Sequence, residues 1–376
     1  MNWLGCKNIL CIRPDNMGDL IMTVPAFRAL KDTFGAKITV LTSSMAKGII
    51  KNIAEIDDHI IFDLPWVKTE AQSKTDEFYE VVAQIKARKF DAAVIFTVYS
   101  QNPLPTAMLA YLAGIPKILA YSRENPYQLL TNWVPDKEPY TQLKHQVTRD
   151  LELVAAVGAT SKDHKLRLTV NEVCWQPVTD KLTGLGIDLN RPWLILHAGV
   201  SEEKRRYPVK EWVAAAMQLI NEGHQVLFTG SASEKQLTDE LERLTGAGSF
   251  SIAGMLNIEE FVCLIKHAPV IVSVNTGTVH IAAAVGTPVV VLYAQTNPQH
   301  TPWMAPHKVL EFSVPNHLRS KNQVIAYVNK TIYNTHVAVP AASKVMAAVN
   351  DLLNLPGSPA QLFPEIPGEN RATATS

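Results

Sequence analysis

The sequence contains few cysteines and has no excess of positive or negative charge. Its four cysteines, Cys6, Cys11, Cys174 and Cys263, are scattered without a C-x-x-C pair, so we expect no zinc site and a reducing compartment. Two of them, Cys11 and Cys263, lie in apolar runs, where cysteine acts as a core residue. Thirty-five basic and 35 acidic residues give a formal charge of zero, which argues against a strongly basic surface for nucleic acid. Any binding of phosphate groups must therefore be local.

Long apolar runs are also missing. No run approaches the ~20 residues that a membrane-spanning helix needs. The opening segment MNWLGCKNILCIR lacks a basic stretch ahead of an apolar one, so we expect no signal peptide. These absences predict a cytoplasmic protein that is at most peripheral to a membrane. Hydrophobic residues make up 47% of the 376 positions, which is enough for two domains of ordinary size.

Short apolar segments alternate with amphipathic ones in the first half of the chain. Apolar residues run continuously through the expected strands, which is typical of a parallel sheet covered by helices on both faces. We expect strands at 8–13, 37–41, 59–62, 91–97 and 117–120, with a last one at 166–170, and helices at 19–34, 45–53, 77–89, 103–113 and 145–157.

The same alternation restarts near residue 193 and indicates a second α/β unit. We expect strands at 193–197, 225–229, 270–274 and 289–293, and helices at 209–221, 233–244, 258–267, 278–285 and 341–353. The residues after 355 are rich in Pro, Gly, Ser and Thr, and we expect them to be disordered.

The segment 270–298, VIVSVNTGTVHIAAAVGTPVVVLYAQTNP, predicts a strand, a short helix and a second strand. Asn275, Thr276 and Gly277 form the turn between the first strand and the helix. Unpaired backbone N–H groups and the helix dipole at such a turn favour an anion such as phosphate. Gly277 permits a close approach, and His280 lies one turn into the helix. The alternative is an ordinary helix cap, for which Asn and Thr are common.

The segment 13–25, RPDNMGDLIMTVP, also joins a strand to a helix. Asp19 follows Gly18 at this junction and is expected to point into a cleft between the two units. The alternative is that Asp19 only caps its helix. Arg13 is placed to steady a phosphate or a carboxylate nearby.

Two further loops follow strand ends in the second half. Residues 197–208, HAGVSEEKRRYP, carry the hydroxyl of Ser201 and the cations Lys204 and Arg205; the alternative for the cations is a solvated charge run. Residues 229–237, TGSASEKQL, place Glu234 at a helix start. There the alternative is a carboxylate that only stabilises the helix dipole.

Together these segments resemble glycosyltransferase family nine, the ADP-heptose:lipopolysaccharide heptosyltransferases. Residues 13–25 match the pattern R-x-D-x-x-G-D-x-x-x-T-x-P. Residues 273–277 match S-V-D-T-G, with a His, an Ala pair and T-P following. The resemblance covers about residues 8–353, with one clear departure: Asn275 stands where the family usually has Asp.

The resemblance implies a GT-B fold, in which two Rossmann-like doubly wound domains face each other across an interdomain cleft. It predicts an acceptor domain at 1–175 and a nucleotide-sugar donor domain at 176–340. A helix at 341–355 is expected to cross back to the first domain, and a disordered tail is expected at 356–376.

The resemblance also implies an inverting, metal-independent transfer of heptose from ADP-heptose, without a cofactor. The acceptor would be the lipopolysaccharide core or another cell-envelope glycan at the cytoplasmic face of the inner membrane. Asp19 would be the base that deprotonates the acceptor hydroxyl. The implied donor ligands are Ser201, Lys204 or Arg205, Thr276, Gly277 and His280 for the diphosphate, Glu234 for the ribose, Leu256 for the adenine and Asn275 for the sugar. Counting from Ala198 favours Lys204, whereas counting back from Pro208 favours Arg205.

The acceptor side of the cleft is less clear from the sequence. Gln101 and Asn102 follow a strand end, Arg123 lies in a later loop and His145 starts a helix. With Arg13, these residues could face an anionic or polyhydroxylated acceptor, or they could be ordinary loop residues.

Asn275 also keeps other functions open, because its amide accepts and donates hydrogen bonds but carries no charge. The alternatives are a family member with another nucleotide sugar or acceptor, a nucleotide-sugar binding protein without turnover, and an epimerase of the same fold.

Overall fold

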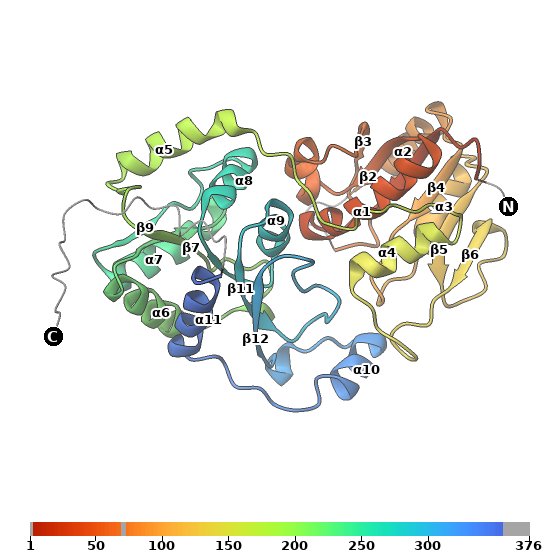
Figure 1. The fold of residues 1–376 in the computed structure, drawn as a ribbon. Coiled ribbons are helices and arrows are strands. Elements are labelled where there is room, and N and C mark those ends of the chain that lie inside the picture. The colour runs from red at the N-terminus through yellow and green to blue at the C-terminus, as the bar shows by residue number, and fades with distance from the viewer. Residues whose placement is uncertain (1–2, 69–72, 356–376) are drawn as a thin grey trace, which may run out of the picture.

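The computed structural model describes residues 3–68 and 73–355 and contains two parallel six-stranded sheets (Figure 1). The first sheet has the strand order β3-β2-β1-β4-β5-β6. Its strands are β1 (Asn8–Ile12), β2 (Lys37–Thr42), β3 (Asp58–Ile61), β4 (Ala92–Ile95), β5 (Ile118–Ser122) and β6 (Asn132–Pro135).

The second sheet has the order β12-β11-β10-β7-β8-β9. Its strands are β7 (Trp193–His197), β8 (Gln225–Thr229), β9 (Ser249–Ser251), β10 (Ile271–Val274), β11 (Val289–Ala294) and β12 (His307–Phe312). Numbered from its own first strand, this sheet has the same order as the first. In each sheet, strands are added first on one side of the first strand and then on the other, so the strand order switches between β1 and β4 and between β7 and β10. Ligands bind such sheets beyond the carboxyl ends of these strands.

Helices cover both faces of each sheet. In the first half, α1 and α4 belong to one buried apolar cluster and α2 and α3 to another. In the second half, α5, α8 and α9 cover one face and α6 and α11 the other. The helices are α1 (Met17–Phe34), α2 (Thr75–Ala87), α3 (Leu104–Leu112), α4 (Gln146–Ala155), α5 (Trp175–Gly184), α6 (Val209–Asn221), α7 (Lys235–Thr245), α8 (Ile258–His267), α9 (Gly277–Val285), α10 (Gln323–Thr331) and α11 (Ala342–Leu353).

The two halves share one of these clusters. Buried residues from α1, such as Ile21 and Val24, and from α9, such as Ile281, belong to the same apolar cluster. Helices α1 and α9 contact each other directly. The cleft edges of the two sheets are therefore held together by packed helices.

Most predicted elements are present, and four expectations need correction. The predicted strand at 166–170 does not join the sheet, although Thr169 N–H donates to the Asn52 carbonyl. The predicted α-helix at 45–53 is a 3-10 helix, η1 (Ser44–Asn52). Strands β6, β9 and β12 and helices α5 and α10 were not predicted. Cys11 and Cys263 are buried, as expected.

The last helix does not cross back to the first domain, which is the fourth correction. Helix α11 packs on α6 and on strands β11 and β12, and its Val345, Val349 and Leu352 are buried in the core of the second sheet. Helix α10 instead approaches the first half, where Val328 and Tyr333 cluster with Tyr99. The apolar side of α11 packs on the second sheet. Burial of these side chains stabilises the helix there, so it does not cross to the first domain.

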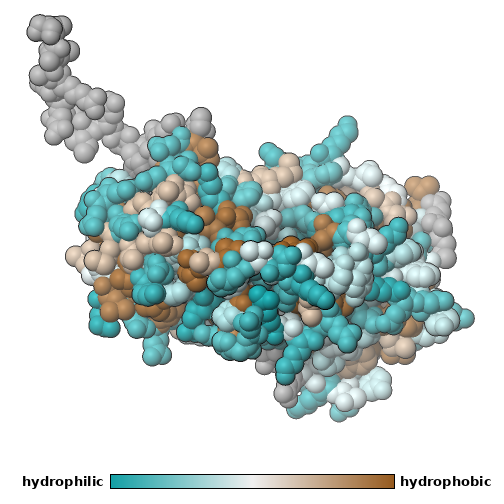
Figure 2. Space-filling view, turned by 90° about the horizontal axis from the view of Figure 1, so that it is seen from below, coloured by the Kyte–Doolittle hydropathy of each residue, from teal (hydrophilic) through white to brown (hydrophobic). Residues whose placement is uncertain are grey.

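The division into domains at residue 175 stays a prediction, and the tail at 356–376 lies outside the described residues. In the described part of the chain, no helix is both long enough and apolar enough to cross a membrane. On the face shown in Figure 2, hydrophobic residues form scattered patches among hydrophilic ones.

Candidate functional site

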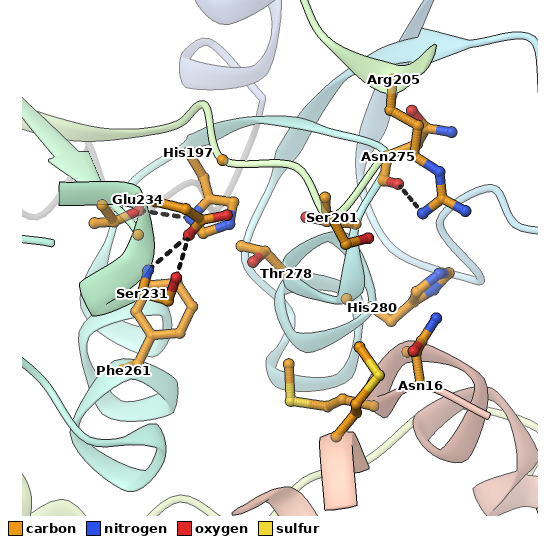
Figure 3. A pocket seen from close by; sticks show the side chains of 18 of the residues that line it. Asn16, His197, Ser201, Arg205, Ser231, Glu234, Phe261, Asn275, Thr278 and His280 are labelled. Carbon is orange, nitrogen blue, oxygen red and sulfur yellow. Dashed lines mark hydrogen bonds between the residues drawn. The ribbon is translucent and has the colours of Figure 1, made fainter. Parts of the chain in front are cut away.

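A cavity of about 450 Å³, here called cavity A, opens beyond the carboxyl ends of β7, β8 and β10 and is closed on one side by the start of α1. Most of the predicted donor-site residues line it. They are Ser201, Arg205, Glu234, Leu256, Asn275, Thr276, Gly277 and His280, together with the proposed base Asp19. Figure 3 shows several of these side chains around the opening.

Two helix N-termini, one from each half, meet at cavity A. A Cβ atom on Gly18 would lie 2.8 Å from His280 Cδ2 and 3.2 Å from Gly277 Cα, and a Cβ atom on Gly277 would lie 3.1 Å from Met17 Cε. Both positions therefore require the space that glycine leaves. The first N–H groups of α1 and α9 have no partners within their helices, and both helix dipoles direct their positive ends into this region.

Asp19 occupies the first turn of α1 and is almost completely buried. Arg13 Nη2 lies 3.0 Å from Asp19 Oδ1, and Asn16 N–H donates to Oδ2 at 3.3 Å. Burial alone would raise the pKa of the Asp19 carboxyl, but the Arg13 guanidinium, helped by other positive groups nearby, holds that pKa below its ordinary value. Asp19 is therefore both a helix cap and an ionised carboxylate facing the cavity.

Two histidines flank this carboxylate. His300, in the loop after β11, has Nε2 3.7 Å from Asp19 Oδ1, and its ring meets that of His280 edge to face at 6.3 Å. Burial is the main reason why the pKa of His280 falls to about 3 and that of His300 to about 4. Both rings are consequently neutral at pH 7, and the buried Nδ1 atom of His280 has no hydrogen-bond partner.

Asn275 lines cavity A, but its amide is engaged with the neighbouring strand. Nδ2 donates to the Ala294 carbonyl at 3.2 Å and to Thr296 Oγ1 at 3.0 Å, while Oδ1 accepts from Ala294 N–H at 3.2 Å. These bonds join the ends of β10 and β11. Because Thr276 N–H donates to the Val274 carbonyl at 2.8 Å, the turn offers a potential ligand mainly the backbone N–H of Gly277.

The structure separates the two candidate cations. Arg205 lines cavity A, and its Nη1 donates to the Asn275 carbonyl at 3.2 Å (Figure 3). Its Nη2 also lies 3.3 Å from Glu202 Oε2. Lys204 does not line cavity A and pairs with Glu202 at 3.2 Å. Arg205 is thus the cation beside the turn that is predicted to bind an anion.

The Glu234 carboxylate both caps a helix and faces cavity A. Its Oε2 accepts from Ser231 N–H at 2.7 Å and from Ser231 Oγ at 3.0 Å, so it helps to cap the short helix η5 (Ala232–Glu234) (Figure 3). The carboxylate also lines cavity A and lies against Gly199, where an added Cβ atom would come within 2.1 Å of it. The carboxylate is fixed in place and faces the cavity.

A second cavity, cavity B, of about 190 Å³, lies on the other side of Asp19. Asp19, Arg205, Thr296 and His300 line both cavities. Cavity B is further lined by Lys204 and by polar residues from both halves, among them Asp15, Ser100, Gln295, Arg319, Ser320 and Asn329.

The five predicted acceptor residues line neither cavity A nor cavity B, and the described contacts give each of them a structural partner. Arg13 holds Asp19, Gln101 Nε2 donates to Asp15 Oδ1 at 2.5 Å, and Asn102 caps the start of α3 by accepting from Leu104 N–H. Arg123 donates to the Glu138 and Tyr99 carbonyls. His145 caps α4 and lies 2.8 Å from the Thr301 carbonyl.

Sequence reasoning missed His197, Phe261 and His300 on the wall of cavity A. His197 ends β7 and pairs with Thr229 Oγ1 at 2.9 Å. His300 could have been found, because it follows β11, and the carboxyl ends of neighbouring parallel strands meet at one edge of a sheet.

The sequence and the fold were compared with known proteins. Residues 79–330 match the family model described as glycosyltransferase family 9 (heptosyltransferase). The chain is 26% identical over 305 residues to lipopolysaccharide heptosyltransferase 2 of Escherichia coli K12, covering 78% of this chain and 84% of that protein. It is also 26% identical over 362 residues to lipopolysaccharide heptosyltransferase 3 of the same strain, covering 89% of this chain and 95% of that protein.

Two solved structures share the fold. A family 9 glycosyltransferase from Veillonella parvula superimposes with a TM-score of 0.74 at 17% identity, covering 94% of this chain and 98% of that one. E. coli ADP-heptose lipopolysaccharide heptosyltransferase II superimposes with a TM-score of 0.69 at 23% identity, covering 92% and 98%. These likenesses establish the GT-B arrangement of the two sheets.

Proposed function

Because the chain belongs to glycosyltransferase family 9, the heptosyltransferase family, we propose that it moves heptose from ADP-heptose onto the lipopolysaccharide core or another cell-envelope glycan. Glycosyl transfer is the activity of the family. The donor and acceptor are taken from relatives whose names specify lipopolysaccharide and, in one solved structure, ADP-heptose.

We place the donor in cavity A in the following orientation. Its diphosphate would lie beside Thr276 at the N-termini of α1 and α9, where the Gly277 backbone N–H and the Arg205 guanidinium would stabilise negative charge. Glu234 would accept hydrogen bonds from the ribose, and Leu256 would contact the adenine. This orientation leaves the heptose at the Asp19 end of the cavity.

The acceptor would enter from cavity B. Asp19 lies on the wall between the cavities and is ionised, so it can take a proton from an acceptor hydroxyl as that oxygen attacks the anomeric carbon. This position of Asp19 is the observation that carries the proposal. A single displacement with a base on the acceptor side inverts the configuration at the anomeric carbon.

Protein groups would replace a metal at the leaving group. Charge builds on the departing diphosphate, and preorganised cations and N–H groups stabilise it. Arg205 and the two helix N-termini fill this role in cavity A. Adding magnesium or manganese to EDTA-treated enzyme should therefore not raise the transfer rate; a restored rate would contradict this assignment.

The proposed positions of the donor and the acceptor also imply a role for each half of the chain. We propose that residues 1–175 form the acceptor domain and residues 176–340 the donor domain. Since the proposed acceptor is a membrane glycolipid, the enzyme would work at the cytoplasmic face of the inner membrane.

The test uses purified enzyme with ADP-heptose and a heptose-deficient core acceptor, with mass spectrometry of the product. Asp19→Asn should lower kcat by about 10²–10⁴-fold, the usual value of general-base catalysis, while ADP binds with little change. Asp63→Asn, an acidic residue outside both cavities, is the control. Near-normal transfer by folded Asp19→Asn enzyme would refute the role of the base. Release of free sugar without an acceptor would instead favour a hydrolase or an epimerase.

A further inference from the structure

Three residues with metal-binding side chains, Glu172, Cys263 and His267, meet on the second half, away from cavity A, and Cys174 lies two residues after Glu172 in the chain. Glu172 and Cys174 lie in the short helix η3 (Glu172–Cys174), just before α5, and Cys263 and His267 lie one turn apart on α8. Both η3 and α5 pack against α8. None of the four residues lines cavity A or cavity B.

The distances in this cluster suit one small cation. Ligand atoms of Glu172, Cys263 and His267 all lie within 4.8 Å of one another. Of these atoms, His267 Nε2 and Glu172 Oε2 are 3.4 Å apart. Ligand atoms around a tetrahedral zinc ion are separated by roughly 3.3–3.8 Å, given metal–ligand distances of about 2.0–2.3 Å. Only small side-chain adjustments are needed to reach that geometry.

The His267 ring is held in a position suited to binding a metal. Its Nδ1 lies 3.0 Å from the Cys263 carbonyl, and a ring nitrogen can pair with a carbonyl only as a donor. Trp175 stacks on the ring at 3.9 Å and an angle of 9°. With Nδ1 engaged in this way, Nε2 is the ring nitrogen that faces the Glu172 carboxylate, and a metal ion can bind between the two groups. Metal-binding histidines commonly donate their other N–H to a carbonyl in this way.

The donor set indicates which metal the cluster would bind. Glu259 and Glu260 lie in the first turn of α8, but Glu260 is paired with Lys181 at 2.7 Å, so the ligands themselves must select the cation. The mixture of thiol, imidazole and carboxylate suits zinc better than magnesium or calcium.

We propose that Glu172, Cys263 and His267 bind one zinc ion, with the Cys174 thiol or a water molecule as the fourth ligand. The ion would fasten the segment that connects the two sheets to the C-terminal end of α8. The other end of α8 contributes Ile258 and Phe261 to cavity A, so the ion would stabilise a wall of the cavity without touching the substrates. This site is independent of the proposed transfer reaction.

The experiment measures metal binding by the full-length protein under reducing conditions. After bound metal has been removed and zinc has been added, the protein should take up about one zinc ion per chain. Mass spectrometry of the eluted metal measures this ratio. Cobalt should produce a thiolate-to-cobalt absorption band. Added zinc should also raise the thermal midpoint, because a ligand that binds the folded state stabilises it.

Variants identify the ligands. His267→Gln and Glu172→Gln should weaken zinc binding tenfold or more, and Cys263→Ser should abolish the cobalt band. The Glu172 side chain is 61% exposed, so Glu172→Gln should fold even if Cys263→Ser does not. His336→Gln, an exposed histidine elsewhere in the second half, is the matched control.

Two outcomes would overturn the proposal. Folded wild-type protein that binds no zinc would show that His267 and Glu172 only pair with each other. Undiminished zinc affinity in both His267→Gln and Glu172→Gln would place the metal elsewhere. Neither outcome bears on the transfer reaction, which is measured separately in the product assay.

Discussion

The side-chain amide of Asn275 determines the shape of the turn between β10 and α9. Its side chain donates to the Ala294 carbonyl and to Thr296 and accepts from Ala294 N–H. Aspartate, which the family usually has here, can accept but cannot donate. The departure from the family pattern is therefore matched to two acceptors, the Ala294 carbonyl at the end of β11 and the Thr296 hydroxyl in the loop that follows.

Replacing this residue by the family's usual one should disturb both stability and donor binding. Asn275→Asp would place a carboxylate oxygen opposite the Ala294 carbonyl and bring negative charge toward the diphosphate. We expect the free energy of unfolding to fall by roughly 1–3 kcal/mol, the cost of an unsatisfied buried group, and ADP binding to weaken. Denaturant unfolding and calorimetry measure the two effects.

The control for this change is Asn322→Asp. Asn322 caps α10 only by accepting hydrogen bonds from Val324 N–H and Ile325 N–H, and aspartate caps helices as well as asparagine does. The free energy of unfolding of the Asn322→Asp enzyme should equal that of the wild type. Equal stability of the Asn275→Asp and wild-type enzymes would mean that the amide contacts contribute little.

His280 gives the protein a measurable sensitivity to acid. Burial lowers its pKa to about 3, whereas an unfolded histidine titrates near about 6.5. Between these values the unfolded chain binds a proton that the folded protein does not, so stability falls as the pH falls. The slope for this group is about 1.4 kcal/mol per pH unit.

His280→Gln should remove this slope. The difference in unfolding free energy between the wild type and the variant should shift by about 2 kcal/mol from pH 7 to pH 5, as measured by urea unfolding. The carboxyls of Asp15 and Asp150, whose pKa burial raises to about 6, act with the opposite sign but are common to both proteins. A pH-independent difference would show that His280 is protonated in the folded state.

At the scale of elements, the contact between α1 and α9 joins the two halves at the site. Gly18→Ala would place a methyl group 2.8 Å from the His280 ring and 3.2 Å from the Gly277 backbone. Overpacking of this kind costs about 1–3 kcal/mol. We expect that loss in unfolding free energy together with a lower transfer rate, because the start of α1 also carries Asp19.

A helical glycine elsewhere provides the comparison. Gly184, at the end of α5, has no atom within 4 Å of an added Cβ, so Gly184→Ala should be neutral or slightly stabilising. If Gly18→Ala behaved in the same way, the close approach of α1 and α9 would not constrain the site.

The strands and helices that the sequence predicted well are the buried ones. Val209–Asn221 and Ile258–His267 agree with their predicted bounds, because regular apolar spacing extends from end to end. The missed strands are edge strands: β6 is half-buried and ends in Pro135, and β9 has three residues. The false strand at 166–170 has buried leucines at alternate positions, Leu166 and Leu168, but it packs outside the ladder.

Residues of the candidate site could be predicted where a charged residue or a glycine lies in the loop that follows a predicted strand. Asp19, Arg205 and Gly277 each follow such an end and line cavity A. The lining of cavity B, the proposed acceptor entrance, was not predictable, because it combines Ser100 with Arg319 and Asn329 from distant segments. The cluster of Glu172, Cys263 and His267 has no spacing motif, since only the packing of η3 on α8 brings it together.

At the scale of the whole molecule, the loop after β11 is inserted into the first half. Gln299 is fully buried there. Its Nε2 donates to Glu138 Oε2 at 3.2 Å and to the Lys144 carbonyl at 3.0 Å, while Oε1 accepts from Tyr99 N–H at 3.3 Å. The next residue is His300, which lies beside Asp19. The hydrogen bonds of Gln299 therefore fix the distance between the two halves at the place where donor and acceptor would meet.

Gln299→Ala would remove three hydrogen bonds that cross between the halves and leave Tyr99 N–H and the Lys144 carbonyl without these partners. We expect unfolding free energy to fall by about 1–3 kcal/mol and the cleft to widen, measured as a larger radius of gyration in solution scattering. In the proposed mechanism, catalysis requires both cavities to meet at Asp19, whereas ADP would be held mainly by the second half. The variant should therefore lose more in kcat/KM for transfer than in ADP affinity. Gln218→Ala, on the exposed side of α6, should change none of these quantities. Loss of stability with normal kcat/KM and an unchanged radius would make Gln299 a packing residue that does not control how the two halves close.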